Sequence, residues 1–146
     1  MSTNVIINLA EAAIETVLMP FLVGTIVASR VSISDETAIQ FTQPNIVIHT
    51  TECEEIVSPG SGIYKMTIGI ILQSHVKENT KAERDAVVSA ITNFAYSDPA
   101  TALSAVSGFH CYGFEPKSGS ITLDPETKSY NLENYYQLTC MPRDNA

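Results

Sequence analysis

The sequence predicts an α+β domain: a mainly antiparallel sheet of about four strands, with an N-terminal helix and a central helix packed on one face. Three observations lead to this prediction. Residues 62–75 alternate apolar and polar side chains, the period of a strand that buries one face. Residues 80–94 carry an apolar stripe at helical spacing. Consecutive predicted strands are joined by turns rather than by helical crossovers, which favours antiparallel pairing.

The N-terminal helix is expected over residues 3–19. Its apolar stripe consists of Ile6, Leu9, Ala10, Ala13 and Val17. The opposite, polar face holds Asn8, Glu11 and Glu15. Pro20 and Gly24 are expected to end the helix. Because residues 1–19 contain no Lys or Arg and are interrupted by polar residues, they do not read as a signal peptide or a membrane span.

The next segment leaves two readings open and is followed by a clearer strand. Within residues 25–43, the apolar residues Ile26, Val27, Val31 and Ile33 could form a short strand, and residues 35–40 a short helical turn. Residues 45–51 are predicted as a strand after Pro44. Residues 52–62 hold three glutamates, one proline and two glycines, the composition of a mobile acidic loop.

The second half of the chain begins with the most clearly marked helix. Thr80 and Glu83 have the spacing of a capping box, and the apolar stripe behind it is Val87, Ala90, Ile91 and Phe94. Asp98 and Pro99 repeat the start signal for a shorter helix through Val106.

Two further strands close the domain. They are predicted over residues 109–114 and 130–140, separated by a long turn-rich tip at residues 115–128. No internal repeat is present, and residues 1–146 are expected to form a single domain.

Charge and cysteine content exclude some classes of function. Eight basic residues against 16 acidic ones give a formal net charge of -8, which argues against gripping nucleic acid by its phosphates. The three cysteines leave at least one thiol unpaired, which suits a reducing cytoplasm better than a disulfide scaffold.

No catalytic, cofactor-binding or metal-binding set is predicted. His49 and Cys53 lie roughly 13 Å apart if the segment is extended, too far to share one ion. Neighbouring His110 and Cys111 would point to opposite faces of a strand. A Cys–His nucleophile is disfavoured because two of the cysteines fall inside predicted strands, where a buried thiol is the usual role. The glutamates at 52, 54 and 55 lack the pattern of a calcium loop. We therefore expect no metal, no cofactor and no structural disulfide.

One strand offers a contact residue for a partner. Tyr136 is expected in the core, whereas Tyr135, beside Glu133 and Gln137, faces the other side. Tyrosine is enriched in interfaces, so Tyr135 is predicted to touch a partner.

The order of these segments resembles one family. The Ala- and Leu-rich N-terminal helix is followed by Pro-Asn-Ile-Val-Ile-His, Glu-Cys-Glu-Glu, and a Gly-x-Tyr strand that ends in Gln-Ser-His. Thr-Lys-Ala-Glu-Arg-Asp heads the central helix, and Phe-His-Cys-Tyr-Gly-Phe and Asn-Tyr-Tyr-Gln-Leu-Thr-Cys close the chain. From about residue 3 to 141, this order resembles the tail terminator and tail completion proteins of the neck of tailed bacteriophages.

The resemblance implies a structural virion protein and no enzyme. The resemblance implies a ring, a homohexamer, that caps the tail tube and joins it to the head connector or stopper proteins. DNA would pass through the ring without specific binding, no membrane would be involved, and the ring would be assembled in the host cytoplasm. Alternatives are another neck component, a small cytoplasmic enzyme, or a monomeric binding module.

Partner contacts are expected on the two turn-rich segments and the last strand. Residues 52–62 and 115–128 should be mobile in the free subunit and become ordered against a neighbouring subunit. The predicted interface residues are Glu52, Glu54, Glu55, Lys117 and Tyr135.

Overall fold

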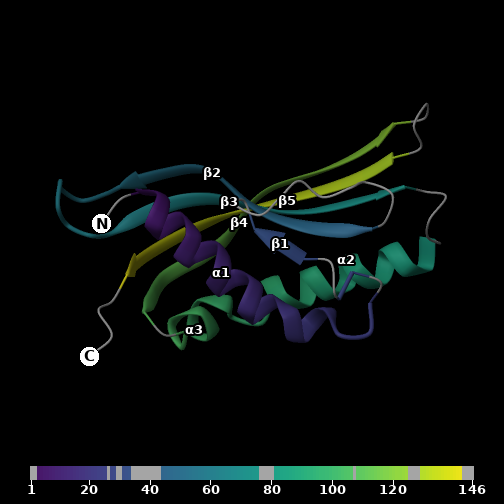
Figure 1. Cartoon of the computed structure of the whole chain (residues 1–146), viewed down its shortest axis with the longest axis horizontal. Helices are drawn as coiled ribbons and strands as arrows, with labels where there is room; N and C mark the ends of the chain where they lie inside the picture. The colour runs from purple at the N-terminus through teal and green to yellow at the C-terminus, as the bar shows by residue number, and fades with distance from the viewer. Residues whose placement is uncertain are drawn as a thin grey trace.

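The computed structural model describes residues 3–25, 27–28, 31–33, 44–75, 81–106, 108–124 and 129–142. Within these residues the chain forms three helices and five strands (Figure 1). Their order and bounds are α1 (Thr3–Leu22), β1 (Val31–Ile33), β2 (Asn45–Glu55), β3 (Tyr64–His75), α2 (Lys81–Ala95), α3 (Pro99–Ser104), β4 (Phe109–Asp124) and β5 (Ser129–Pro142). The predicted α+β class is confirmed.

The sheet is mixed and has five strands, so the prediction of about four mainly antiparallel strands was incomplete. The strand order is β1-β2-β3-β5-β4. β1 pairs in parallel with β2, and the remaining three pairs are antiparallel. β1 has only three residues, too few for alternation to distinguish a strand from a loop, and local periodicity does not reveal a parallel partner.

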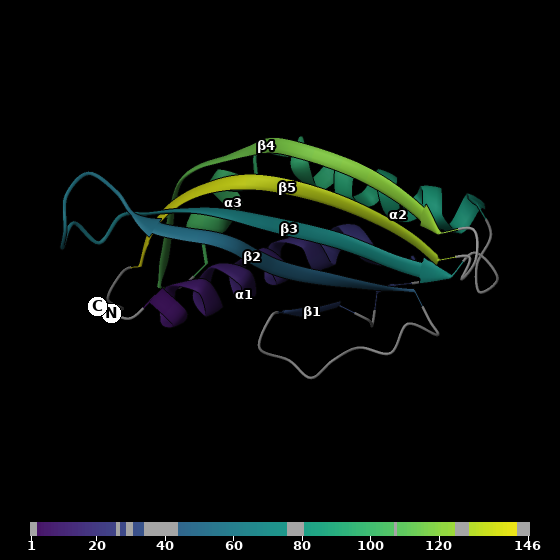
Figure 2. The same ribbon diagram turned by 90° about the horizontal axis from the view of Figure 1, so that it is seen from above.

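The helices cover one face of the sheet, as the sequence predicts. Seen from above, the long strands β2, β3, β5 and β4 lie in front of the helices, and β1 lies at the margin beside α1 (Figure 2). The alternating residues of β3 that face the helices are buried: Tyr64, Met66, Ile68, Ile70 and Leu72. They belong to the same buried cluster as the buried stripe of α2, which is the predicted set Val87, Ala90, Ile91 and Phe94. The core therefore lies between one sheet face and the helices.

Helix ends depart from the prediction in three places. α1 continues through Pro20 to Leu22, and Gly24 follows in the left-handed conformation at φ +87°. Pro20 cannot donate a backbone hydrogen bond to the Thr16 carbonyl, and α1 ends two residues after it. α3 ends at Ser104, before Val106. Asp98 does not cap α3 with its side chain, whose Oδ2 instead accepts a hydrogen bond from the Thr101 hydroxyl at 2.6 Å. The predicted cap residue of α2, Thr80, lies outside the described residues.

Two segments predicted as loops contain strand residues, namely 52–55 of the first segment and 115–124 of the second. β2 extends to Glu55, so only residues 56–63 form the turn to β3. β4 extends to Asp124, and residues 125–128 lie outside the described residues. Polar composition misled the prediction, because these parts of the sheet are exposed to solvent. Pro116 has no backbone N–H to donate to a neighbouring strand. It is compatible with β4 because β4 is an edge strand, with a partner on one side only.

Bulges interrupt the two outer long strands. The β2–β3 register shifts between Thr50 and Glu52. The β4–β5 register shifts between Cys111 and Gly113 and again between Pro116 and Ser118. Each shift leaves one extra residue in the outer strand, and such bulges bend a strand and redirect a side chain. In β4 the second extra residue is Lys117.

Glu11 lies in the core, contrary to the prediction that it belongs to the polar face of α1. Its side chain is 0% exposed. Its Oε2 accepts hydrogen bonds from the Thr50 backbone N–H at 2.8 Å and from the Thr50 hydroxyl at 2.7 Å. β1 pairs with β2 only as far as Ile48. At Thr50, just beyond this point, the Glu11 carboxylate accepts the backbone hydrogen bond that a neighbouring strand would otherwise accept. Glu11 thus fastens α1 to the sheet.

α1 is also long and apolar enough to cross a membrane by length and composition, over Val5–Leu22. In the structure its apolar stripe packs against the sheet instead, with Ile6, Ala10, Ile14, Leu18 and Leu22 all at 0% exposed. This packing and the Glu11–Thr50 hydrogen bond are those of a helix that belongs to the core, which explains why α1 is so apolar.

Candidate functional site

The face of the sheet opposite the helices carries most of the predicted contact residues. We call it the open face, because none of the described helices covers it (Figure 2). Its centre is the row Lys65, Thr67 and Gly69 of β3, paired with Thr139, Gln137 and Tyr135 of β5. These side chains are polar or aromatic and mostly half-buried. Such a surface is suited to contact a macromolecule.

Lys117 reaches across this face. Its ammonium group donates a hydrogen bond to the Thr67 hydroxyl at 3.1 Å. The side chain starts at the β4 bulge, so it spans β5, which lies between β4 and β3. With Glu52 and Glu54 of β2 and Lys65 of β3, it lines a hollow of about 370 Å³. The structure therefore brings Lys117 together with Glu52 and Glu54, although Lys117 is far from both glutamates in sequence.

Tyr135 lies on the same face, over the backbone of β3. A Cβ at Gly69 would sit 2.9 Å from Cε1 of the Tyr135 ring, so the ring occupies the space that a side chain would need. Its hydroxyl donates to Glu133 Oε1 at 2.8 Å, and this hydrogen bond is the main reason that the pKa of Tyr135 is raised. Tyr135 is thus held in place by a cross-strand glycine and a neighbouring carboxylate.

Glu55 does not join this cluster. Its two carboxylate oxygens accept hydrogen bonds from the backbone N–H groups of Gly60 and Gly62, at 2.8 and 2.9 Å. These bonds, first from Gly60 and then from Gly62, lower the pKa of the Glu55 carboxyl. The Glu55 carboxylate therefore stabilises the turn between β2 and β3 within its own chain.

This role predicts an acid-dependent change in the turn. Because the folded-state pKa of Glu55 is lowered, its stabilising contribution is present above the ordinary glutamate value and is lost as the pH falls through the lowered pKa. We expect the amide resonances of Gly60 and Gly62 to titrate together with a midpoint below 4.5. NMR against pH measures this. In Glu55→Gln the titration should disappear, and a midpoint at or above 4.5 would contradict the assignment.

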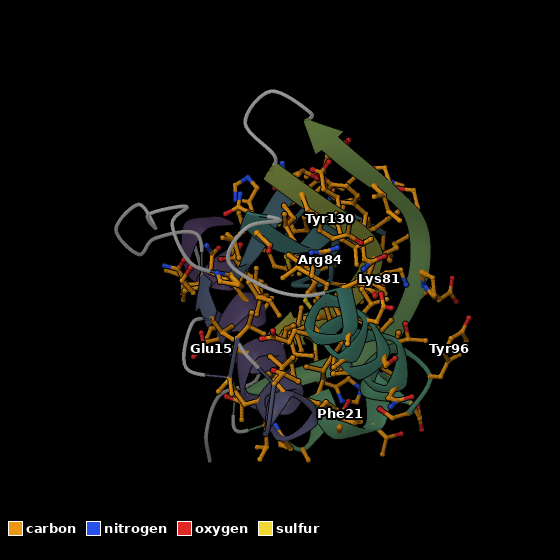
Figure 3. All side chains as sticks on the ribbon, turned by 90° about the vertical axis from the view of Figure 1, so that its right-hand side faces the viewer. Glu15, Phe21, Lys81, Arg84, Tyr96 and Tyr130 are labelled. Atoms are coloured by element: carbon orange, nitrogen blue, oxygen red, sulfur yellow. The ribbon has the colours of Figure 1, made fainter. Side chains whose placement is uncertain are left out.

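A second concave surface was not predicted from the sequence. It lies between the C-terminal end of α2 and the β4–β5 hairpin, with a volume of about 320 Å³. It is lined by Thr92, Ala95 and Tyr96, residues 116–119 of β4 and residues 134–136 of β5. We call it the α2–β4 groove. Tyr96, 81% exposed, projects at its outer edge beside β4 (Figure 3). The one local signal was a tyrosine directly after an amphipathic helix.

Tyr136 forms the inner wall of the groove. Its ring stacks on Phe114 with the centroids 4.9 Å apart. Burial, and to a lesser degree the neighbouring Tyr96, raises the pKa of Tyr136 to about 12. The groove therefore combines a buried aromatic wall with an exposed aromatic rim.

The three cysteines are free thiols in the structure. Burial raises the pKa of Cys111 to about 11 and that of Cys140 to about 12, and it also raises the pKa of Cys53. At neutral pH these thiols are protonated, the form that is a poor nucleophile. Among the described residues, no three His, Cys, Asp or Glu side chains lie close enough together to hold a metal ion.

Comparison with known proteins does not assign the chain to a family. No protein-family model matches it, and no curated protein matches it significantly.

Proposed function

We propose that this protein is a structural component of a phage neck, a tail terminator whose subunits form a ring, most simply a hexamer, on the end of the tail tube. The proposal rests on the resemblance in segment order described above. The observation that supports it best is the open face, where polar and aromatic side chains from four strands are held in a fixed arrangement and none of the described helices covers them. A surface of this kind serves contact between macromolecules.

The edges of the sheet also favour assembly. β4, at 16 residues, is an edge strand, and β2 has no strand partner on its outer side beyond Ile48 among the described residues. Uncovered edges invite pairing with other chains, and natural proteins shield them or use them. Neighbours in a closed ring would cover both edges of every subunit.

The charge of the chain fits a ring around DNA. A formal net charge of -8 gives each subunit a field that repels phosphate, so DNA can pass without being retained. The partners of such a ring are the tube protein on one side and the head connector or stopper proteins on the other, and its location is the virion neck.

A tube-polymerisation assay tests this function. Adding the protein to growing tubes, assembled from the tube protein of the same phage, should stop elongation and leave one end of each tube capped. Tube lengths measured by electron microscopy should become shorter and more uniform as the protein is added. Unchanged lengths, with binding to a portal or adaptor protein instead, would assign the chain to another ring of the neck.

A further inference from the structure

Cys111 of β4 and Cys140 of β5 lie directly opposite each other on neighbouring strands. They are register partners in the antiparallel β4–β5 pair, so their side chains leave the same face of the sheet. That face is the one that the helices cover, because both residues belong to the buried core, at 6% and 0% exposed. Both are free thiols in the structure. The sheet therefore places two thiols side by side at a position that the proposed function does not use.

The backbone of Cys111 shows which kind of antiparallel pair this is. Its N–H donates a hydrogen bond to the Ser104 hydroxyl oxygen at 3.0 Å, and its carbonyl accepts one from the same hydroxyl at 3.0 Å. The N–H and C=O of one strand residue point to the same side, so both groups of Cys111 face Ser104 of α3 and not β5. Cys111 and Cys140 are thus a non-hydrogen-bonded pair, in which the two Cα atoms lie about 4.5 Å apart.

This spacing suits a disulfide. Bridged cysteines have their Cα atoms about 4.4–6.8 Å apart, so the pair can be linked without a change in strand pairing. Their proximity also affects the pKa of Cys140, which burial raises to about 12 with a further contribution from Cys111 and a smaller one from Cys53. Cys53 lies on β2, which β3 separates from β5. Two strand spacings are about 9.5 Å, too far for a disulfide between Cys53 and Cys140.

We propose that Cys111 and Cys140 form a dithiol site that a small disulfide oxidant, of the glutathione disulfide class, converts to an intrachain disulfide. The Cys111 thiol, the more exposed of the two, loses its proton and attacks one sulfur of the oxidant. A mixed disulfide forms and one thiolate leaves, which takes up a proton. The Cys140 thiol then loses its proton and attacks the Cys111 sulfur, and the second thiol of the oxidant leaves. Two protein thiols are thereby oxidised to one disulfide, and the oxidant is reduced to two thiols.

Local opening of the strand ends gives the oxidant access to this site. Burial raises the pKa of Cys111 to about 11, which slows the reaction in the closed fold. The pair lies only two residues from the end of the β4–β5 ladder, where Phe109 is paired with Pro142. Strand ends open more readily than the centre of a sheet. A reducing compartment would keep the two thiols free, and an oxidising one would fasten the edge strand β4 to β5. This chemistry goes beyond the proposed function and does not depend on it.

Peptide mapping of the oxidised, folded chain tests the site. The protein is incubated under native conditions with excess glutathione disulfide, alkylated and digested with trypsin, which leaves the three cysteines in the separate peptides 31–65, 85–117 and 129–143. We expect one link, between 85–117 and 129–143, in a monomer whose intact mass has decreased by two hydrogen atoms. A link to peptide 31–65, glutathione adducts without an intrachain link, or thiols that all stay reduced would each overturn the proposal.

The melting temperature provides a second measurement. The disulfide closes residues 111–140 into a loop, so oxidation should raise the melting temperature by about 5 °C or more, and a reductant should reverse the change. Cys53→Ala is the matched control, in which the link and the shift should both persist. Cys111→Ala and Cys140→Ala should lose both. If either variant does not fold, the peptide map of the unsubstituted chain still decides the outcome. A link that forms without raising the melting temperature would contradict a pair that fits the native sheet.

Discussion

Replacing Phe94 by alanine should lower the free energy of unfolding by about 4 kcal/mol, as expected for a fully buried phenylalanine. Phe94 is 0% exposed and lies where α1, α2 and β4 meet. Its ring packs edge-to-face against Phe21 of α1 at 5.9 Å and against Phe114 of β4 at 5.6 Å, between centroids. The substitution therefore removes contacts in three elements at once and leaves a cavity that these elements cannot easily close.

Chemical denaturation measures this change, with Phe94→Leu as the matched control. Leucine keeps most of the apolar volume, so its effect should be less than about 1.5 kcal/mol. The slope of the unfolding free energy against denaturant concentration should be similar in the unsubstituted protein, Phe94→Ala and Phe94→Leu, which would show that the substitutions change stability alone. A loss of less than about 1.5 kcal/mol in Phe94→Ala would show that this junction is not the centre of the core.

Replacing Glu11 by leucine should destabilise the fold by about 3 kcal/mol, even though leucine is more apolar and a better match to a core. The loss arises because the Thr50 N–H and hydroxyl would both be left without the Glu11 oxygen that now accepts them. Glu11→Gln keeps a carbonyl oxygen at the same place and should cost only about 1 kcal/mol.

Asn8→Leu provides the control for this pair, because Asn8 is on the exposed face of the same helix. Thermal and chemical unfolding of the three variants would give the ranking, and amide exchange at Thr50 would locate the effect. If Glu11→Leu were as stable as Glu11→Gln, the hydrogen bonds to Thr50 would not be what fastens α1 to β2.

Local patterns were sufficient for the elements that the core requires. The alternation from Tyr64 to Leu72 and the stripe from Val87 to Phe94 identified the buried faces of β3 and α2 correctly. Both patterns arise from burial on one side of a regular element, so they are visible within one segment of sequence. Pairing partners are not visible within one segment. The short strand at Val31–Ile33 was therefore left open as one of two readings, and its parallel pairing with β2 was not predicted.

Glu11 shows where the same reasoning fails. Helical spacing placed it opposite the apolar stripe, and a carboxylate normally belongs in water. Its position in the core depends on Thr50, 39 residues further on, whose N–H lies just beyond the end of β1. Only the tertiary structure provides that donor, so no local pattern could have predicted it.

Sequence patterns did not show which of the candidate interface residues share a surface. Glu52, Glu54, Lys117 and Tyr135 belong to the same side of the sheet, whereas Glu55 is used within its own turn. Residues 52–55 and 115–124, predicted as loop, proved to be strand ends, because exposed strands carry the polar residues that also characterise loops. The α2–β4 groove is formed by elements that are distant in sequence.

A reconstruction of the neck of the assembled particle tests the central claim most directly. The account predicts a closed ring of this chain, with six copies, seated on the end of the tail tube and facing the head connector. In each copy the open face should contact a neighbouring subunit. A particle in which this chain is present as a monomer, or is absent from the neck, would contradict the account.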